Sequence, residues 1–262
     1  MDYLKINKKL WNDKVAVHLN SDFYDNENFI RTKASLNPYE LALLGDLRQQ
    51  HVLHLQCHFG QDSISLAQLG ARVTGVDFSD KAIEAARQLA DTTRTETVDF
   101  ICCDVYELPR QLDKQFDVVF TTYGTIGWLP DLTKWAEVIA HFLKPGGQLI
   151  FVEFHPFVWM FDEDFKQIRY SYFNKQAIVE EETGTYTDRN AALQNTSISW
   201  NHPVSEVVNA LINAGLSIRS LSEYDTSPYN CFKNMEQVGI KQYRIAHLAD
   251  HIPMVYSIVA SK

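Results

Sequence analysis

Short apolar runs alternate with stretches of helical periodicity along most of the chain. The runs are apolar almost throughout, which is typical of strands covered on both faces, whereas the stretches between them repeat apolar residues every three or four positions. This alternation predicts an α/β fold in which helices connect the strands of one sheet. The expected strands are 52–55, 72–77, 98–102, 116–121, 148–154, 216–221 and 253–260, and the expected helices are 8–17, 38–47, 61–69, 79–91, 131–142 and 204–214.

The first expected strand leads directly into a turn and a helix. Gly60 permits a sharp turn, and Asp62 or Ser63 can accept hydrogen bonds from the first free N–H groups of the helix that follows. A helix that begins at the carboxyl end of a parallel strand places free N–H groups and the positive end of its dipole at that edge of the sheet. A polar ligand is therefore expected to bind there.

The second expected strand ends on a carboxylate, Asp77, which lies 17 residues after Gly60. An acid at this position can accept hydrogen bonds from both ribose hydroxyls of a nucleoside cofactor. The alternative is that Asp77 only caps the helix that starts near Ser79. Ser79 and Asp80 can cap that helix themselves, so the ribose role is favoured.

The chain resembles the class I S-adenosylmethionine-dependent methyltransferases in the order and spacing of five segments, which are specific only as a set. The resemblance implies a Rossmann-like, doubly wound, seven-stranded, mostly parallel sheet whose last strand is antiparallel. It also implies S-adenosyl-L-methionine as the cofactor. The segments are Val52–Ala67, Gly75–Ser79, Cys103–Val105, Phe116–Phe120 and Leu143–Gly147.

The resemblance further implies which residues contact the cofactor. Asp104 and Val105 are expected beside the adenine, with the Asp104 carboxylate accepting from the exocyclic amine. The alternative is an aspartate that serves only the turn before Tyr106. The full set of expected cofactor contacts is Gln56, Cys57, His58, Gly60, Asp62, Asp77, Phe78, Asp104, Val105 and Tyr123.

The turn after the first strand departs from the family's pattern, which has three glycines and an acid two residues before the first of them. Gln56 and His58 stand at the first two glycine positions, His54 stands at the position of the acid, and only Gly60 remains. The turn looks most like that of a bacterial subgroup with the sequence Leu-Gln-Cys-His-Phe-Gly. Side chains at 56 and 58 must therefore fit where the backbone normally passes close to the cofactor.

Methyl transfer requires an aligned acceptor, exclusion of water and, for some acceptors, removal of a proton. Residues 122–128 follow the fourth strand and combine glycines with aromatics, as expected beside the methionine part of the cofactor and the acceptor. His58, His155 and His202 are candidate bases, although a structural histidine is the competing interpretation of each. We select His155 as the base, with Tyr123 positioning the acceptor.

Composition narrows the class of substrate. The 262 residues include 24 Lys and Arg against 33 Asp and Glu, which gives a formal net charge of −9. No Lys/Arg cluster stands out, so a nucleic-acid substrate is not expected. The four cysteines form no CxxC pair, so buried thiols are expected rather than a metal site. The N-terminus lacks the apolar core of a signal peptide and no run is long enough to span a bilayer, which predicts a cytoplasmic protein without a membrane partner.

A single domain, 1–262, is the simplest organisation. Residues 1–37 are expected to form a lid or, equally well, a packing arm, and residues 38–156 the cofactor-binding core. An insertion at 157–200 is expected to be a β-rich cover over the acceptor, or alternatively the interface of a homodimer. The C-terminal part of the sheet, 201–262, contains a second insertion at 224–250.

Three functions from different classes compete. The first is methyl transfer from S-adenosylmethionine to a small-molecule acceptor. The second is a non-catalytic S-adenosylmethionine or S-adenosylhomocysteine-binding protein on the same scaffold, which the altered turn would suit. The third is an NAD-dependent dehydrogenase, because a strand-ending acid also suits the ribose of NAD. The number of strands and the Lys-Pro-Gly-Gly turn at 144–147 disfavour the third.

Overall fold

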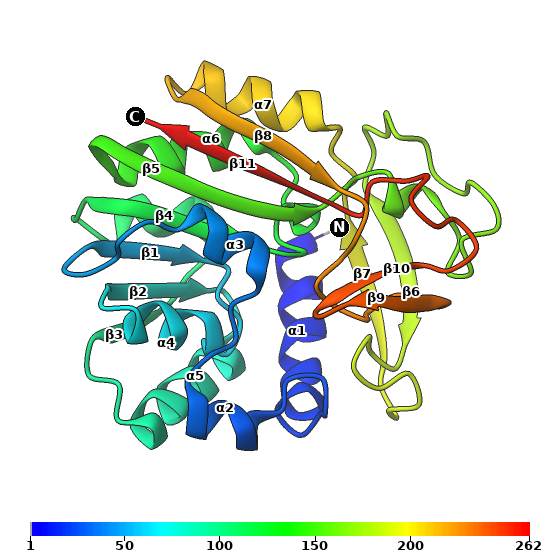
Figure 1. Ribbon diagram of the computed structural model, residues 1–262, viewed down its shortest axis with the longest axis horizontal. Helices are drawn as coiled ribbons and strands as arrows, with labels where there is room; N and C mark the ends of the chain where they lie inside the picture. The colour runs from blue at the N-terminus through cyan, green and yellow to red at the C-terminus, as the bar shows by residue number, and fades with distance from the viewer. Residues whose placement is uncertain (1) are drawn as a thin grey trace.

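The computed structural model describes residues 2–262, which contain a seven-stranded sheet with the strand order β3-β2-β1-β4-β5-β11-β8 (Figure 1). The five strands from β3 to β5 pair in parallel, and β11 is antiparallel to both of its neighbours. The expected fold class is therefore confirmed. The strands are β1 His51–Leu55, β2 Arg72–Asp77, β3 Val98–Cys102, β4 Phe116–Thr122, β5 Leu143–Phe154, β8 Ser217–Tyr224 and β11 Val255–Ser261.

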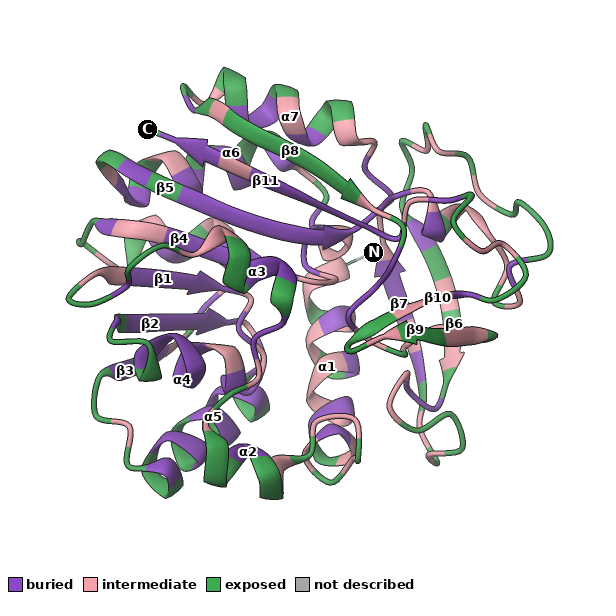
Figure 2. Cartoon of the chain, viewed as in Figure 1, coloured by how far each residue is buried: buried purple, intermediate pink, exposed green. Residues whose placement is uncertain are grey.

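Helices cover both faces of this sheet and bury its apolar side chains. Helices α6 and α7 pack on one face, where Trp135 of α6 and Phe151 of β5 are fully buried in edge-to-face contact. Helices α4 and α5, together with α1 to α3, contribute to the core on the other face. Figure 2 shows the central strands buried and the outer surfaces of the helices exposed. The helices are α2 Asn26–Thr32, α3 Pro38–Leu43, α4 Gln61–Gln68, α5 Asp80–Thr93, α6 Leu132–Phe142 and α7 Val204–Asn213.

The strand order reverses between β1 and β4, which are neighbours in the sheet. Chain connections leave these two strands in opposite directions, so the turns at their carboxyl ends diverge. Ligands of open α/β sheets bind at such a point. The turn after β1 is 56–60 and the turn after β4 is 123–127.

Helix α1, Tyr3–Leu19, is longer than the expected helix 8–17. Its apolar period is weak because three polar side chains are buried, namely Asn7, Lys14 and His18. Figure 1 shows α1 running past the carboxyl ends of the strands. The N-terminal segment therefore borders the edge of the sheet where ligands are expected.

Two hairpins extend beyond that edge. Strands β6 Ile178–Thr183 and β7 Gln194–Ser199 form one antiparallel pair, and β9 Met235–Gly239 and β10 Gln242–Ile245 form the other. Figure 1 shows both pairs on the side of α1 away from the sheet. A separate apolar cluster joins the second pair to the end of β5 through residues such as Ile245 and Phe154.

Several boundaries and burial expectations were wrong. Helix α3 ends at Leu43, and Leu41 on it is exposed. Residues 144–147 belong to an irregular beginning of β5, where the pairing with β4 shifts by several residues. Cys102 is exposed because β3 is an edge strand, whereas Cys57 and Cys103 are buried.

Candidate cofactor and acceptor site

The turn after β1 holds two non-glycine residues in the left-handed region of backbone space. Gln56 has φ +54° and His58 has φ +51°, and these are the two positions at which the resembled family has glycine. A left-handed conformation costs a residue with a side chain about 1–2 kcal/mol. The turn thus keeps a backbone conformation that glycine favours, and side-chain contacts must offset the cost.

Both side chains make such contacts. Nε2 of Gln56 donates to the main-chain oxygen of Thr125 at 2.8 Å, which ties the turn after β1 to the turn after β4. The ring of His58 stacks on Tyr24 with centroids 5.6 Å apart. Oε1 of Gln56 is buried and has no hydrogen-bond partner within residues 2–262. Because the amide nitrogen faces a carbonyl, which only accepts, the unpaired atom is fixed as the acceptor oxygen.

Gly60 is needed for packing at the start of α4. Its φ is +82°, and a Cβ built there would lie 2.6 Å from the ring of Phe100 on β3. The helix therefore begins close against the sheet, which directs its free N–H groups toward the carboxyl edge. Cys57 is buried in the same turn, and its N–H donates to the main-chain oxygen of Val76.

The carboxylate of Asp77 is fixed at the end of β2 by two main-chain donors. The N–H of His58 donates to Oδ2 and the N–H of Ser79 donates to Oδ1, each at 2.9 Å. Burial raises the pKa of Asp77 to about 6, although the donated hydrogen bonds oppose the shift. Ser79 itself caps α5 by accepting from the N–H of Ala82, so Asp77 is not the cap of that helix.

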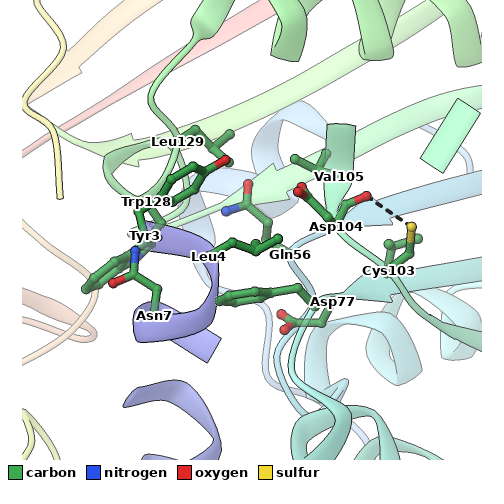
Figure 3. Close-up of a pocket in the computed structure, with 12 residues that line it drawn as sticks. Tyr3, Leu4, Asn7, Gln56, Asp77, Cys103, Asp104, Val105, Trp128 and Leu129 are labelled. Atoms are coloured by element: carbon green, nitrogen blue, oxygen red, sulfur yellow. Dashed lines mark hydrogen bonds between the residues drawn. The ribbon is translucent and has the colours of Figure 1, made fainter. Parts of the chain in front are cut away.

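A small pocket opens beside Asp77 (Figure 3). Its floor comes from the ends of β2 and β3, and Figure 3 shows Asp77 and Asp104 on one side of it with Trp128 and Leu129 on the other. Tyr3, Leu4 and Asn7 of α1 form its roof. Asp104 also accepts a hydrogen bond from the N–H of Tyr106 at 3.0 Å, so it serves a turn as well as lining the pocket.

A much larger cavity of about 880 Å³ adjoins this pocket. The two share Gln56, Asp77, Phe78 and Trp128 as lining residues, so they are contiguous. The cavity wall is largely aromatic, which suits a flat apolar ligand. Its aromatic lining comprises Trp11, Phe23, Tyr24, Phe29, Phe59, Phe78, Tyr123, Trp128, Phe154, Trp159, Tyr170, Tyr186, Trp200, Tyr229, Phe232, Tyr243 and Tyr256.

Asp62 lies in the first turn of α4 and lines the large cavity. Its Oδ1 accepts from the hydroxyl of Ser35. Burial raises the pKa of Asp62 above its usual value. His54, at the position of the family's acid, is buried with Nδ1 2.8 Å from the hydroxyl of Ser63, and burial lowers its pKa to about 3. Position 54 therefore provides no carboxylate, and Asp62 in the first turn of α4 supplies one to the wall of the large cavity.

Glu153 near the end of β5 is a buried carboxylate that the sequence analysis missed. It accepts from the main-chain N–H groups of Gly124 and Thr125 and from the hydroxyl of Thr125. Burial raises its pKa, which these donors oppose. This carboxylate fixes the turn after β4. The sequence does contain a signal for Glu153, because it is the single acidic residue within the otherwise apolar run 149–154.

The three candidate histidines lie in different environments. His155 does not line either pocket, because Nε2 lies 2.9 Å from Glu223 and Nδ1 accepts from the N–H of Phe157. Its proposed role as the base therefore has no support from the position of its ring and stays a prediction. His202 lines the large cavity with Nε2 2.8 Å from the main-chain oxygen of Leu129.

His58 lies on the cavity wall, and Nε2 is 3.3 Å from Nδ1 of His18. Burial and the nearby Lys14 lower the pKa of His58 to about 3, so its ring is neutral at physiological pH. A base of that pKa has little driving force for taking a proton. His58 is better explained as part of the packing between α1 and the turn.

Helix α1 is bound to the β6–β7 hairpin by polar contacts that the sequence analysis also missed. The side chain of Asn7 both donates to and accepts from the main chain of Ile198, at 2.7 and 3.0 Å. Nζ of Lys14 lies 2.7 Å from the Glu182 carboxylate. No sequence signal distinguishes these residues from ordinary polar residues on a helix surface.

The described part of the chain contains neither a group of metal-binding side chains nor a helix suited to crossing a membrane. Across residues 2–262, no three His, Cys, Asp or Glu side chains are grouped so that they could hold a metal ion. Over the same range, none of the helices has both the length and the apolar character to cross a membrane.

Residues 52–147 match the model of a family described as "Methyltransferase domain". Curated relatives are similar over about half of the chain. The "Ubiquinone biosynthesis O-methyltransferase" of Albidiferax ferrireducens is 32% identical over 132 residues, which cover 49% of this chain and 52% of that protein. The protein of the same description from Coxiella burnetii is 32% identical over 119 residues, which cover 44% of this chain and 50% of that protein. The chain thus matches only about half the length of these relatives.

Solved structures resemble nearly the whole chain. A S-adenosylmethionine-dependent methyltransferase from Mesorhizobium loti is 20% identical with a TM-score of 0.59, covering 86% of this chain and 96% of its own. The chain in the structure of the DhpI-SAM-HEP complex is 17% identical with a TM-score of 0.60. The match covers 98% of this chain and 97% of that chain. At such identities the likeness concerns the fold. Residues 52–147 therefore match a methyltransferase domain, and the chain has the Rossmann-like fold of S-adenosylmethionine-dependent methyltransferases.

Proposed function

We propose that the protein is an S-adenosylmethionine-dependent methyltransferase that acts on a small organic acceptor. The observation that carries this proposal is the carboxylate of Asp77. It ends β2, next to β1, and lines two contiguous pockets that extend to the point where the strand order reverses between β1 and β4. Its two oxygens already accept from main-chain donors at fixed positions, which leaves its remaining lone pairs for a ligand.

The chemistry of the lining fits the proposed cofactor. Asp77 would hold the ribose hydroxyls, and Asp104, Val105 and Phe78 would hold the adenine in the small pocket. The turn 56–60 and Asp62 would hold the amino-acid part, where the carboxylate of Asp62 suits an ammonium group. The unpaired Oε1 of Gln56 supplies one further acceptor between the two pockets. When bound, the cofactor supplies an electrophilic methyl group and a neutral leaving group.

The size and character of the larger cavity support a small aromatic or apolar acceptor. About 880 Å³ is at the upper end of the range for small-molecule sites, so it can hold an acceptor beside part of the cofactor. The name of the curated relatives, O-methyltransferase, favours an oxygen atom as the methylated group. The net charge of −9 argues against a nucleic-acid substrate.

The domain organisation is part of the same proposal. We propose that residues 1–37 form a lid over the core 38–156, because α1 contributes to both pockets. The insertions 157–200 and 224–250, the second within the C-terminal part 201–262, would shape the acceptor end of the cavity. Residues from both insertions line it, Tyr186 and Tyr229 among them.

The setting in which the protein works is also proposed rather than observed. We propose a cytoplasmic enzyme, because its four cysteines are free thiols, as is usual in a reducing compartment. A homodimer through the insertion 157–200 is supported by its exposed apolar side chains, Ile168 and Phe173, which are 64% and 72% exposed. Sedimentation at two protein concentrations tests this part independently of activity.

A second function, binding without catalysis, is favoured by one observation. Gln56 and His58 introduce side chains where the resembled family has glycine, and such a change can retain a ligand while losing alignment for chemistry. Incubation with methyl-labelled S-adenosylmethionine and a bacterial small-molecule extract separates the two functions. Label that moves into an extract component supports the methyltransferase. Tight binding of the cofactor with no transfer of label supports the binding protein.

A further inference from the structure

A tyrosine and a glutamate form a buried pair at the wall of the large cavity. Tyr123 follows β4 and lines the cavity, and its hydroxyl donates to Oε2 of Glu40 at 2.6 Å. Glu40 comes from α3, which precedes the sheet in sequence. The pair therefore joins α3 to the turn on which the acceptor is proposed to lie.

Glu40 is fully buried, and within residues 2–262 no Lys, Arg or His side chain forms an ion pair with it. Its Oε1 accepts from the main-chain N–H of Asn37 at 2.6 Å. Besides Tyr123, the ionisable groups that face it include Asp62 on α4, Tyr39 on α3 and Tyr229 in the loop before β9, and the Asp62 charge is repulsive. Lys241 at the turn between β9 and β10 instead donates to Oδ1 of Asn37. Burial and the Asp62 charge raise the pKa of Glu40 to about 7.

A purely structural role explains only half of this arrangement. Glu40 is the third residue of α3, and its contact with Asn37 is one arm of a capping box. That contact uses Oε1 alone, and glutamine serves equally well at this position. A capping contact through Oε1 does not require the other carboxylate oxygen, Oε2, to be buried. The contact between Oε2 and Tyr123 is thus left for another explanation.

Tyr123 has the geometry of a functional residue. Its φ is +50°, a conformation that costs a tyrosine about 1–3 kcal/mol and that often marks active sites. The N–H of Tyr123 donates to Val152, so the turn is fixed against β5. Burial raises the pKa of Tyr123 well above its usual value, so the phenol stays protonated. On its own, therefore, it cannot accept a proton from an acceptor molecule.

We propose that Tyr123 and Glu40 together accept the proton that the methyl acceptor loses, an inference that rests on the proposed function. The acceptor would carry an O–H or N–H group at the cavity face of Tyr123. Its heteroatom bonds to the methyl carbon, and the bond from that carbon to sulfur breaks with its electron pair left on sulfur. The acceptor's proton moves to the oxygen of Tyr123, and the original Tyr123 proton moves to Oε2 of Glu40. Tyr123 is the catalytic residue of this step and Glu40 positions and deprotonates it.

The test is the pH dependence of label transfer from methyl-labelled S-adenosylmethionine to components of a bacterial small-molecule extract. In the unaltered protein the rate should fall as pH drops below about 7, because protonated Glu40 cannot take a proton. Glu40→Gln and Tyr123→Phe should each lower the rate about 100-fold and remove this limb of the profile. The double variant should be no slower than either single variant, because both changes interrupt one pathway.

Controls separate proton transfer from folding and from binding. Glutamine preserves the capping contact, so Glu40→Gln should melt within a few degrees of the unaltered protein. Glu40→Gln should also bind S-adenosylhomocysteine within about twofold of the unaltered protein. Glu180→Gln alters a second tyrosine–glutamate pair, in which Tyr170 donates to Glu180 at 2.7 Å with Arg169 nearby. Whatever the absolute rate of label transfer by Glu180→Gln, that rate should fall at the same pH as in the unaltered protein.

Each outcome bears on one claim. Retention of the limb and of the rate in Glu40→Gln or in Tyr123→Phe would overturn the relay while leaving the methyltransferase intact. If the fall in rate at low pH disappeared in Glu180→Gln as it does in Glu40→Gln, that result would also overturn the relay. Binding of S-adenosylhomocysteine without any label transfer by the unaltered protein would overturn the relay and favour the non-catalytic function. Absence of both binding and transfer would remove the proposed function itself.

Discussion

The main-chain N–H of His58 donates to Oδ2 of Asp77 at 2.9 Å, so the turn after β1 and the carboxylate at the end of β2 form one structural unit. The left-handed backbone at His58 directs that N–H toward β2. A turn without its first two glycines therefore still presents the acidic side chain in a defined position. The proposed site depends on this coupling more than on the identity of the side chains at 56 and 58.

Asp77→Asn should weaken binding of S-adenosylhomocysteine at least tenfold, or about 1.4 kcal/mol. The amide keeps the size of the side chain but loses the charge and one acceptor that two ribose hydroxyls would use. For the unaltered protein, affinity should also fall as pH drops below about 6, where Asp77 takes up a proton. Calorimetry measures both effects. Asp99→Asn, on the exposed face of β3, is the matched control and should leave affinity unchanged. Equal affinity in Asp77→Asn would remove the ribose assignment.

Gln56→Gly should be more stable than Gln56→Ala by about 1 kcal/mol. Both variants lose the hydrogen bond to Thr125, but only alanine retains the cost of the left-handed conformation. The comparison of the two variants thus isolates the backbone contribution. Denaturant unfolding measures it. Equal stability of the glycine and alanine variants would mean that the turn is not strained at position 56.

Asn7→Ala should destabilise the protein by about 2 kcal/mol. The change removes two hydrogen bonds and leaves the buried N–H and C=O of Ile198 on β7 unpaired. It should also weaken binding of S-adenosylhomocysteine, because Asn7 belongs to the roof of the small pocket. Asn20→Ala is the control at the end of the same helix, since Asn20 is exposed and its side chain donates to the main-chain oxygen of Ala16. A similar loss of stability in both variants would argue against the special role of Asn7.

His18→Asn should destabilise the protein more at pH 7.5 than at pH 5.5. Burial lowers the pKa of His18 to about 2, so the folded state holds it neutral while the unfolded chain binds a proton below about 6.5. The stability that His18 contributes is therefore complete above pH 6.5 and declines as pH falls. The gap between variant and unaltered protein should narrow by about 1 kcal/mol at pH 5.5. Urea unfolding at the two pH values measures this, and a constant gap would contradict the depressed pKa.

The sheet could be predicted from the sequence because each central strand is a nearly uninterrupted apolar run. Asp77 could be predicted because it ends such a run at a characteristic distance from Gly60. The same reasoning underestimated α1, whose period is hidden by buried Asn7, Lys14 and His18. These side chains are buried only because the β6–β7 hairpin supplies partners from far along the chain, which no local pattern reveals.

The selection of His155 as the base rested on a local signal of the same kind and stays an untested prediction. Its position at the end of β5 indicated the correct edge of the sheet but not the direction of the ring, which Glu223 and Phe157 determine. Tyr123 does line the cavity, and its role stays a prediction. Glu40 lies in the first turn of the expected helix 38–47, and no local pattern indicates its contact with Tyr123, which is 83 residues away in the sequence.

The most direct test of the account is titration calorimetry of the unaltered protein with S-adenosylhomocysteine, with NAD titrated in parallel. We predict one S-adenosylhomocysteine bound per chain with a dissociation constant in the micromolar range or tighter, about −8 kcal/mol or below, and no saturable heat with NAD. The absence of binding by S-adenosylhomocysteine, or equal affinity for NAD, would contradict the claim that the pockets beside Asp77 are built for a nucleoside-bearing methyl donor.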